Sequence, residues 1–161
     1  MLKLNNKKIL NIVLLLSIFI LTSAFYIQYI LGYEACNLCI FQRVPYFLAI
    51  IVILFNIFIK DLKKYIYVLL LTIFLSATIL SFYHLGIEQG LFSESLVCDL
   101  NTKSNSISKE ELLKSLKAEK ISCKNVTFRI LGLSLATINT IISLVLSGIM
   151  FNTIKNYGKN K

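Results

Sequence analysis

Four long apolar runs restrict what this chain can fold into more than any other feature. Each has about the 20 residues that a helix needs to cross a hydrocarbon core of roughly 30 Å. Backbone groups inside a bilayer must hydrogen-bond within their own segment, so the runs predict transmembrane helices. The expected spans are residues 9–31, 41–59, 65–87 and 128–151.

The composition is that of a membrane protein. Charged residues make up 16% of the chain, whereas soluble domains have about 25%. One proline and six glycines leave little room for a turn-rich β architecture. The first run is longer than the roughly 7–15 residues of a signal-peptide core, which favours an uncleaved helix. We therefore expect an all-α, integral membrane four-helix bundle, with residues 1–161 forming a single domain.

The basic residues predict the orientation in the membrane. One side holds nine of them in three short stretches next to span ends, and the other side holds eight over longer segments. By the positive-inside rule, the denser side, with both termini, is cytoplasmic. The net charge of +9 then belongs to membrane-flanking segments and does not indicate nucleic-acid binding. The nine residues are Lys3, Lys7, Lys8, Lys60, Lys63, Lys64, Lys155, Lys159 and Lys161.

Two segments then face outward, a short one near residues 32–41 and a long one over residues 88–127. In the long segment, Ser108 and Glu111 have the spacing of a helix capping box. Three leucines that follow share one face, so we expect a small amphipathic helix, either at the membrane surface or packed on the loop itself. The leucines are Leu112, Leu113 and Leu116.

All four cysteines, Cys36, Cys39, Cys98 and Cys123, fall in these outward segments. An even number of cysteines facing an oxidising compartment implies disulfides, and the sequence leaves three pairings open. Residues 36–39 form a C-x-x-C, the spacing of redox dithiols. Zinc sites of this type usually need a second cysteine pair or histidines, and the chain has one histidine. We therefore predict no metal.

The position of the C-x-x-C favours a reactive pair. Pro45 is tolerated in the first turn of a helix, so the second span should begin near residues 42–44, just after Cys39. A helix N-terminus stabilises a thiolate, and Arg43 adds a positive charge four residues from Cys39. The alternative is a passive membrane scaffold whose cysteines form purely structural disulfides.

These motifs resemble the family of disulfide bond formation protein B, DsbB. The resemblance is carried by residues 36–43 (CNLCIFQR), residues 83–92 (YHLGIEQGLF), Cys98-Asp99, and Cys123 ahead of residues 128–136 (FRILGLSLA). It covers nearly the whole chain. Phe128 stands where a tryptophan is expected.

The resemblance implies a quinone-dependent protein-dithiol oxidoreductase in the bacterial inner membrane, with its cysteines in the periplasm. Its expected partners are the lipid bilayer, a periplasmic thioredoxin-like thiol oxidase (DsbA-like), and ubiquinone or menaquinone. By the same resemblance, Cys98 and Cys123 oxidise the protein partner, with Cys98 as the sulfur attacked. Cys36 and Cys39 form the membrane-proximal pair, with Cys39 next to the quinone.

The resemblance also implies that Arg43 orients the quinone. His84, at the outer end of the third span, either lies near that quinone or is an interfacial histidine solvated at the headgroups. The nearest rival is a vitamin K epoxide reductase-like protein. In that family the C-x-x-C tends to follow the loop cysteines in chain order, whereas here it precedes them.

Overall fold

The computed structural model describes residues 6–58, 63–93, 123, 129–130 and 132–157. Within these ranges, four stretches are long and apolar enough to cross a membrane: Lys7–Tyr29, Asn37–Asn56, Tyr65–Glu88 and Leu135–Tyr157. The prediction of an all-α membrane bundle with four spans is confirmed. Cys98, Phe128 and the amphipathic helix expected after Ser108 lie outside the described residues.

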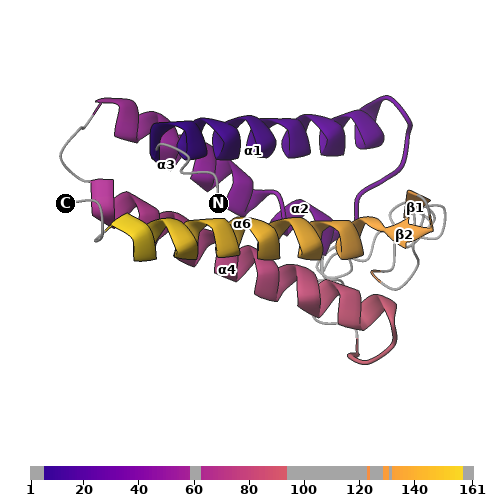
Figure 1. Cartoon of the computed structure of the whole chain (residues 1–161). Helices are drawn as coiled ribbons and strands as arrows, with labels where there is room; N and C mark the ends of the chain where they lie inside the picture. Colours follow the sequence, from indigo (N-terminus) through magenta and orange to yellow (C-terminus); the bar gives the residue numbers. More distant parts are fainter. Residues whose placement is uncertain (1–5, 59–62, 94–122, 124–128, 131, 158–161) are drawn as a thin grey trace, which may run out of the picture.

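The spans run alternately in opposite directions (Figure 1). They are formed by α1 (Asn6–Tyr29), the pair α2 (Asn37–Phe41) and α3 (Val44–Phe58), α4 (Lys63–Glu88), and α6 (Leu135–Tyr157). Helix α1 packs on α3, α3 on α4, and α4 most extensively on α6, whereas α1 and α6 make few or no close backbone contacts. The start of α1 and the end of α6 therefore lie at one end of the bundle, and α2 lies at the other.

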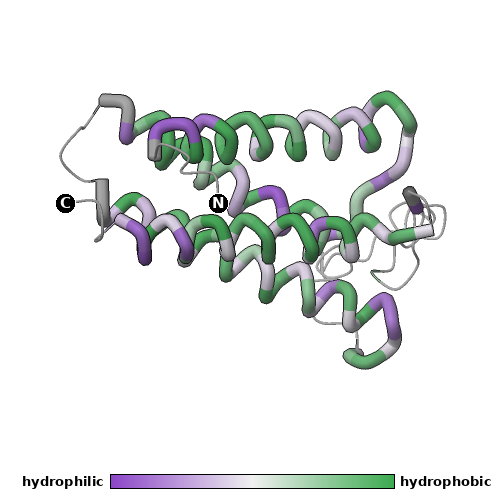
Figure 2. The backbone as a smooth tube through the Cα atoms, viewed as in Figure 1, coloured by the Kyte–Doolittle hydropathy of each residue, from purple (hydrophilic) through white to green (hydrophobic). Residues whose placement is uncertain are grey.

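The four long helices consist mostly of apolar residues, as the colouring in Figure 2 shows, and many of these residues are exposed on the outside of the bundle. Ile79 is 71% exposed and Phe55 is 61% exposed, whereas Ser17, Ser81 and Ser143 are fully buried. Lipid tolerates exposed apolar side chains, and small residues between helices let their backbones approach closely. This distribution is the reverse of that in a soluble protein and agrees with a membrane location.

Pro45 explains why the second span is divided. In a continuous helix its nitrogen would donate to the carbonyl of Phe41, but proline has no N–H and its ring collides with that carbonyl. Helix α2 accordingly ends at Phe41, and α3 begins at Val44. The helical hydrogen-bond pattern resumes with a bond of 3.1 Å from the Phe47 N–H to the Arg43 carbonyl.

The fourth helix begins later than the expected boundary at residue 128. Two short antiparallel strands, β1 (Arg129–Ile130) and β2 (Leu133–Ser134), precede it. Gly132 in the turn between them has φ 82°, a left-handed conformation that glycine adopts easily. Ser134 Oγ accepts a hydrogen bond of 3.2 Å from the Thr137 N–H and caps α6, which starts at Leu135.

The outer end of α4 is closed by a glycine turn. Gly90 has φ 75°, and its N–H donates to the Ile87 carbonyl while the Leu91 N–H donates to the Gly86 carbonyl. These two hydrogen bonds form a Schellman motif, which satisfies carbonyls that the last helical turn leaves unpaired. The turn fixes the direction in which the chain leaves α4, next to His84.

Replacing Gly90 with alanine tests this turn. A side chain in the left-handed region costs about 1–2 kcal/mol, so Gly90→Ala should lower the free energy of unfolding by about that amount. Gly148→Ala is the matched control, because its φ is ordinary and no atom lies within 4 Å of the added Cβ. Denaturation in detergent micelles measures both, and equal stability of the two variants would contradict this account of the turn.

Candidate active site

Cys36 and Cys39 lie at the start of α2. Cys36 is the N-cap residue, and its sulfur accepts a hydrogen bond of 3.3 Å from the Cys39 N–H. The two sulfurs are 2.7 Å apart, and both residues are free thiols. The sequence suggested that a helix begins just after Cys39. The structure places Cys36 at the helix N-terminus and Cys39 inside the helix.

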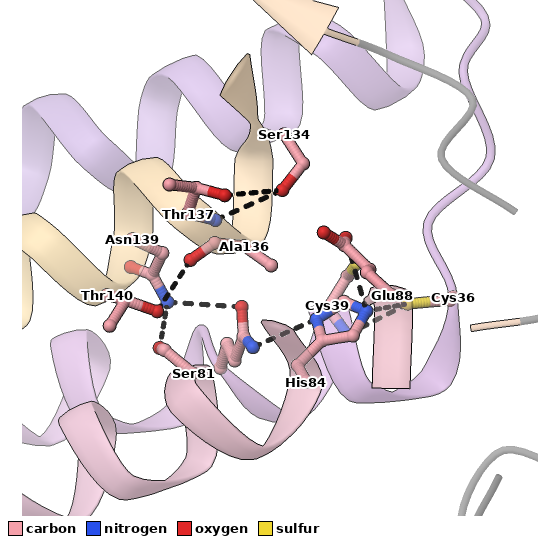
Figure 3. Close-up of polar contacts among 11 residues, drawn as sticks. Cys36, Cys39, Ser81, His84, Glu88, Ser134, Ala136, Thr137, Asn139 and Thr140 are labelled. Atoms are coloured by element: carbon pink, nitrogen blue, oxygen red, sulfur yellow. Dashed lines mark hydrogen bonds and ion pairs between the residues drawn. The ribbon is translucent and has the colours of Figure 1, made fainter. Parts of the chain in front are cut away.

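His84 approaches the same pair from α4 (Figure 3). Its Nε2 atom lies 3.6 Å from Cys36 Sγ and 3.8 Å from Glu88 Oε1, one helical turn further along α4. The side chain is buried, with 2% of the residue exposed. Of the two interpretations of His84, solvation among the headgroups is therefore wrong, and the histidine belongs to the cysteine site.

These contacts favour ionisation of Cys36. The hydrogen bond between the Cys36 and Cys39 side chains is the main cause that lowers the pKa of Cys36 from 9.0 to about 5. Burial of Cys36 acts in the opposite direction, and His84 and the Cys39 N–H lower the pKa further. The lowered pKa favours the thiolate of Cys36, which is the nucleophilic form and a good leaving group in disulfide exchange.

Arg43 lies in the break between α2 and α3 and points towards α1. Its Nη1 donates a hydrogen bond of 2.5 Å to Gln28 Oε1, and its guanidinium carbon lies 5.0 Å from the centre of the Phe25 ring. Both contacts hold α1 beside the cysteine pair. The sequence predicted the cation near Cys39 but not its attachment to the first span.

A cavity of about 630 Å³ lies between α1 and α6. Its walls are mostly aliphatic, and Cys39, Arg43 and His84 are among the polar residues that line it. Phe19 and Val145 also line it while being 68% and 52% exposed, so the cavity reaches the outer surface of the bundle. An apolar space with a few convergent polar groups is typical of a site for an apolar ligand.

Cys123 reaches the same site from the segment that precedes α6. It is disulfide-bonded, buried, and packed in one cluster with Cys36, Leu38 and Ile87. The disulfide that Cys123 forms therefore lies beside Cys36. This neighbourhood suits exchange between two cysteine pairs.

The ligand types at this site also occur in zinc sites. One potential ligand atom each from Cys36, Cys39 and His84 lies within 4.8 Å of the others. Two thiolates on a tetrahedral zinc ion, with Zn–S bonds of about 2.3 Å, stand about 3.8 Å apart. The observed sulfur separation of 2.7 Å is much shorter. The cysteine pair is arranged for a disulfide and does not fit a metal centre as it stands.

Sequence reasoning missed the polar residues around His84. Glu88, Gln42 and Asn139 all lie close to it or to one another. The available signal was Asn139, a polar side chain inside an apolar span, because such residues are costly in lipid and usually mark a function. Glu88 could have been found from its position four residues after His84.

Four apolar helices and a buried dithiol beside an apolar cavity define a membrane protein built for thiol–disulfide chemistry. Residues 6–152 match the family of the disulfide bond formation protein DsbB, and the chain belongs to this family. It is therefore a disulfide-generating membrane oxidoreductase, as the sequence motifs predicted.

A relative has been found in Rickettsia prowazekii (strain Madrid E), under the name uncharacterized protein RP370. It is 33% identical over 142 residues, which cover 86% of this chain and 83% of the relative. No solved structure matches the chain.

The low pKa of Cys36 gives a direct test. With Cys98 and Cys123 replaced by serine, the rate of Cys36 alkylation should follow a thiolate that protonates only near pH 5. Cys39→Ala removes the main hydrogen-bond donor, so the pKa of Cys36 should rise and alkylation at pH 6 should slow. Cys39→Ser keeps a donor and should show a smaller effect. An unchanged pH profile in Cys39→Ala would exclude this cause.

Proposed function

We propose that this protein reoxidises a periplasmic thioredoxin-like dithiol oxidase (DsbA-like). Electrons pass from that partner to the Cys98–Cys123 pair, then to the Cys36–Cys39 pair, and finally to a membrane quinone, ubiquinone or menaquinone. The observation that carries the proposal is the apolar cavity between α1 and α6, with Cys39 in its wall. A lipid-soluble electron acceptor can reach this position, whereas a folded protein cannot.

The lining of the cavity fits a quinone. The aliphatic walls suit an apolar ring and tail, and Arg43 offers a planar donor and a permanent positive charge beside the ring position. When bound, a quinone accepts two electrons and two protons, which the oxidation of one dithiol supplies. Arg43 would orient the ring and favour negative charge near Cys39. His84 would hold a proton beside Cys36.

The packing of Cys123 against Cys36 supports the order of exchange. When the Cys36–Cys39 pair is oxidised, the Cys123 thiolate attacks the Cys36 sulfur, and Cys39 leaves as a thiolate. Cys98 then attacks Cys123, and Cys36 leaves. Its low pKa makes Cys36 a good leaving group. The net result is one new Cys98–Cys123 disulfide and one reduced Cys36–Cys39 dithiol.

The proposed location is the bacterial inner membrane, with both termini in the cytoplasm and the cysteines in the periplasm. The lysine distribution supports this orientation. The arrangement of the bundle is consistent with it, because the start of α1 and the end of α6 lie at the end opposite α2 (Figure 1). Disulfides would then form on the oxidising side.

The role of Arg43 can be measured with purified protein, a reduced thioredoxin-like partner and a soluble quinone. Arg43→Lys should raise the quinone KM or slow turnover roughly tenfold, because lysine lacks the planar fork of the guanidinium. Binding of the partner should not change. Arg129→Lys is the matched control, since Arg129 is the only other arginine and does not line the cavity.

Two outcomes of this assay would count against the proposal. Unchanged quinone kinetics in Arg43→Lys would mean that Arg43 only holds α1 in place and does not act on the quinone. Quinone reduction that survives Cys39→Ser would show that electrons do not pass through the Cys36–Cys39 pair. In that variant, the Cys98–Cys123 disulfide should still oxidise one equivalent of partner.

Trapping tests the direction of electron flow. In Cys123→Ser the thiol that resolves the first exchange is absent, so a mixed disulfide between the partner and Cys98 should accumulate. Non-reducing electrophoresis followed by peptide mass spectrometry identifies the linked cysteine. Capture of the partner on Cys36 or Cys39, with Cys98 left free, would reverse the proposed order.

A further inference from the structure

A chain of side-chain hydrogen bonds connects His84 to the interior of the bundle. Gln42 Nε2 lies 3.0 Å from His84 Nδ1, and Gln42 Oε1 accepts a hydrogen bond of 3.1 Å from Asn139 Nδ2. Asn139 Nδ2 also donates to Ser81 Oγ at 2.6 Å, and Asn139 Oδ1 accepts from the Tyr46 hydroxyl at 2.5 Å. Figure 3 shows the bond between Asn139 and Ser81 and the contacts of His84 with Cys36 and Glu88.

The network joins three spans at buried positions. Gln42 lies in the break before α3, Tyr46 in α3, Ser81 and His84 in α4, and Asn139 in α6. All except Asn139, which is partly buried, are buried. Water is scarce at such positions, so an unpaired amide or hydroxyl would be costly. Each amide is therefore held in the orientation that satisfies its neighbours.

The donor and acceptor of each hydrogen bond can be followed from the Tyr46 hydroxyl to the His84 ring. Because Tyr46 donates to Asn139 Oδ1, Asn139 turns its amide nitrogen towards Gln42. Gln42 accepts through its oxygen and turns its own amide nitrogen towards His84. An amide N–H can only donate, so His84 Nδ1 must be the acceptor.

We propose that Gln42 and Asn139 are positioning residues that keep His84 in the tautomer with its proton on Nε2. That nitrogen is the one that lies 3.6 Å from Cys36 Sγ and 3.8 Å from Glu88 Oε1. In this tautomer the histidine presents a donor to the Cys36 sulfur. In the opposite tautomer it would present a lone pair, which repels a thiolate.

The groups that face the ring agree with a donor at Nε2. They are the Cys36 and Cys39 sulfurs from α2 and the Glu88 carboxylate from α4. The main chain of Cys123 also hydrogen-bonds to the His84 ring. Arg43 is directed to Gln28 and Phe25 instead. The meaning of the tautomer for turnover rests on the proposed redox function, but the tautomer itself does not.

The single histidine makes the tautomer directly measurable. Protein labelled with 15N-histidine has only one imidazole ring, and the 15N shifts of its two nitrogens show which one carries the proton. In the reduced wild-type protein we expect a protonated Nε2 and an unprotonated Nδ1. A ring protonated at Nδ1 would overturn the proposal without any variant.

Two variants remove the network without adding charge. Gln42→Met and Asn139→Leu keep similar volumes, and both should give mixed tautomers and slow Cys36 alkylation at pH 5 roughly fivefold, as a one-unit rise in the pKa of Cys36 requires. Ser147→Ala is the control, because this buried α6 hydroxyl donates to the Ser143 carbonyl and lies outside the network. Wild-type tautomer and alkylation rate in both variants would refute the positioning role.

These measurements separate the two proposals. Neither the NMR shifts nor the alkylation rate requires a quinone or a protein partner. A wild-type protein with the Nε2–H tautomer that fails to reduce quinone would refute the proposed function and leave the tautomer assignment standing. Quinone reduction by a protein whose ring is protonated at Nδ1 would refute the tautomer assignment and leave the proposed function standing.

Discussion

The missing N–H of Pro45 is the constraint on which the rest of the site depends. It ends α2 at Phe41 and so gives the second span an additional helix N-terminus, next to α4. Cys36 caps that beginning, and the turn that follows holds Gln42 and Arg43. An unbroken helix would not supply this turn, from which Arg43 reaches α1 and Gln42 reaches α4.

Most polar side chains inside the bundle find a hydrogen-bond partner within their own helix. Serines and threonines along α4 and α6 donate mainly to carbonyls of their own helix, as Thr78, Ser143 and Ser147 do. Such hydroxyls satisfy themselves and allow close packing. Gln42 and Asn139 differ, because their amides reach other helices. The polar groups that bind across spans are thus concentrated near the cysteines, where the charge on Cys36 needs support.

The sequence predicted the features that depend on local pattern and failed on those that depend on tertiary contacts. Four apolar runs were sufficient for the spans, and the C-x-x-C with Arg43 was sufficient for the family. The expected start of the second span near residues 42–44 agrees with the start of α3 at Val44, but the extra helix α2, capped by Cys36, was missed because apolar periodicity does not reveal it. The burial of His84 and its link to Asn139 join residues 55 positions apart, and a single sequence carries no signal for such pairing.

The loose contact between α1 and α6 has a consequence for how the cavity fills. Phe19 and Val145 line it and are also exposed, so one opening of the cavity lies on the apolar outer surface that faces lipid. A ligand that enters through this opening must first dissolve among the lipids, and acyl chains compete for the same groove. The effective concentration of a ligand is then its mole fraction in the bilayer. Affinities measured in different detergents or lipids would differ even though no residue of the protein has changed.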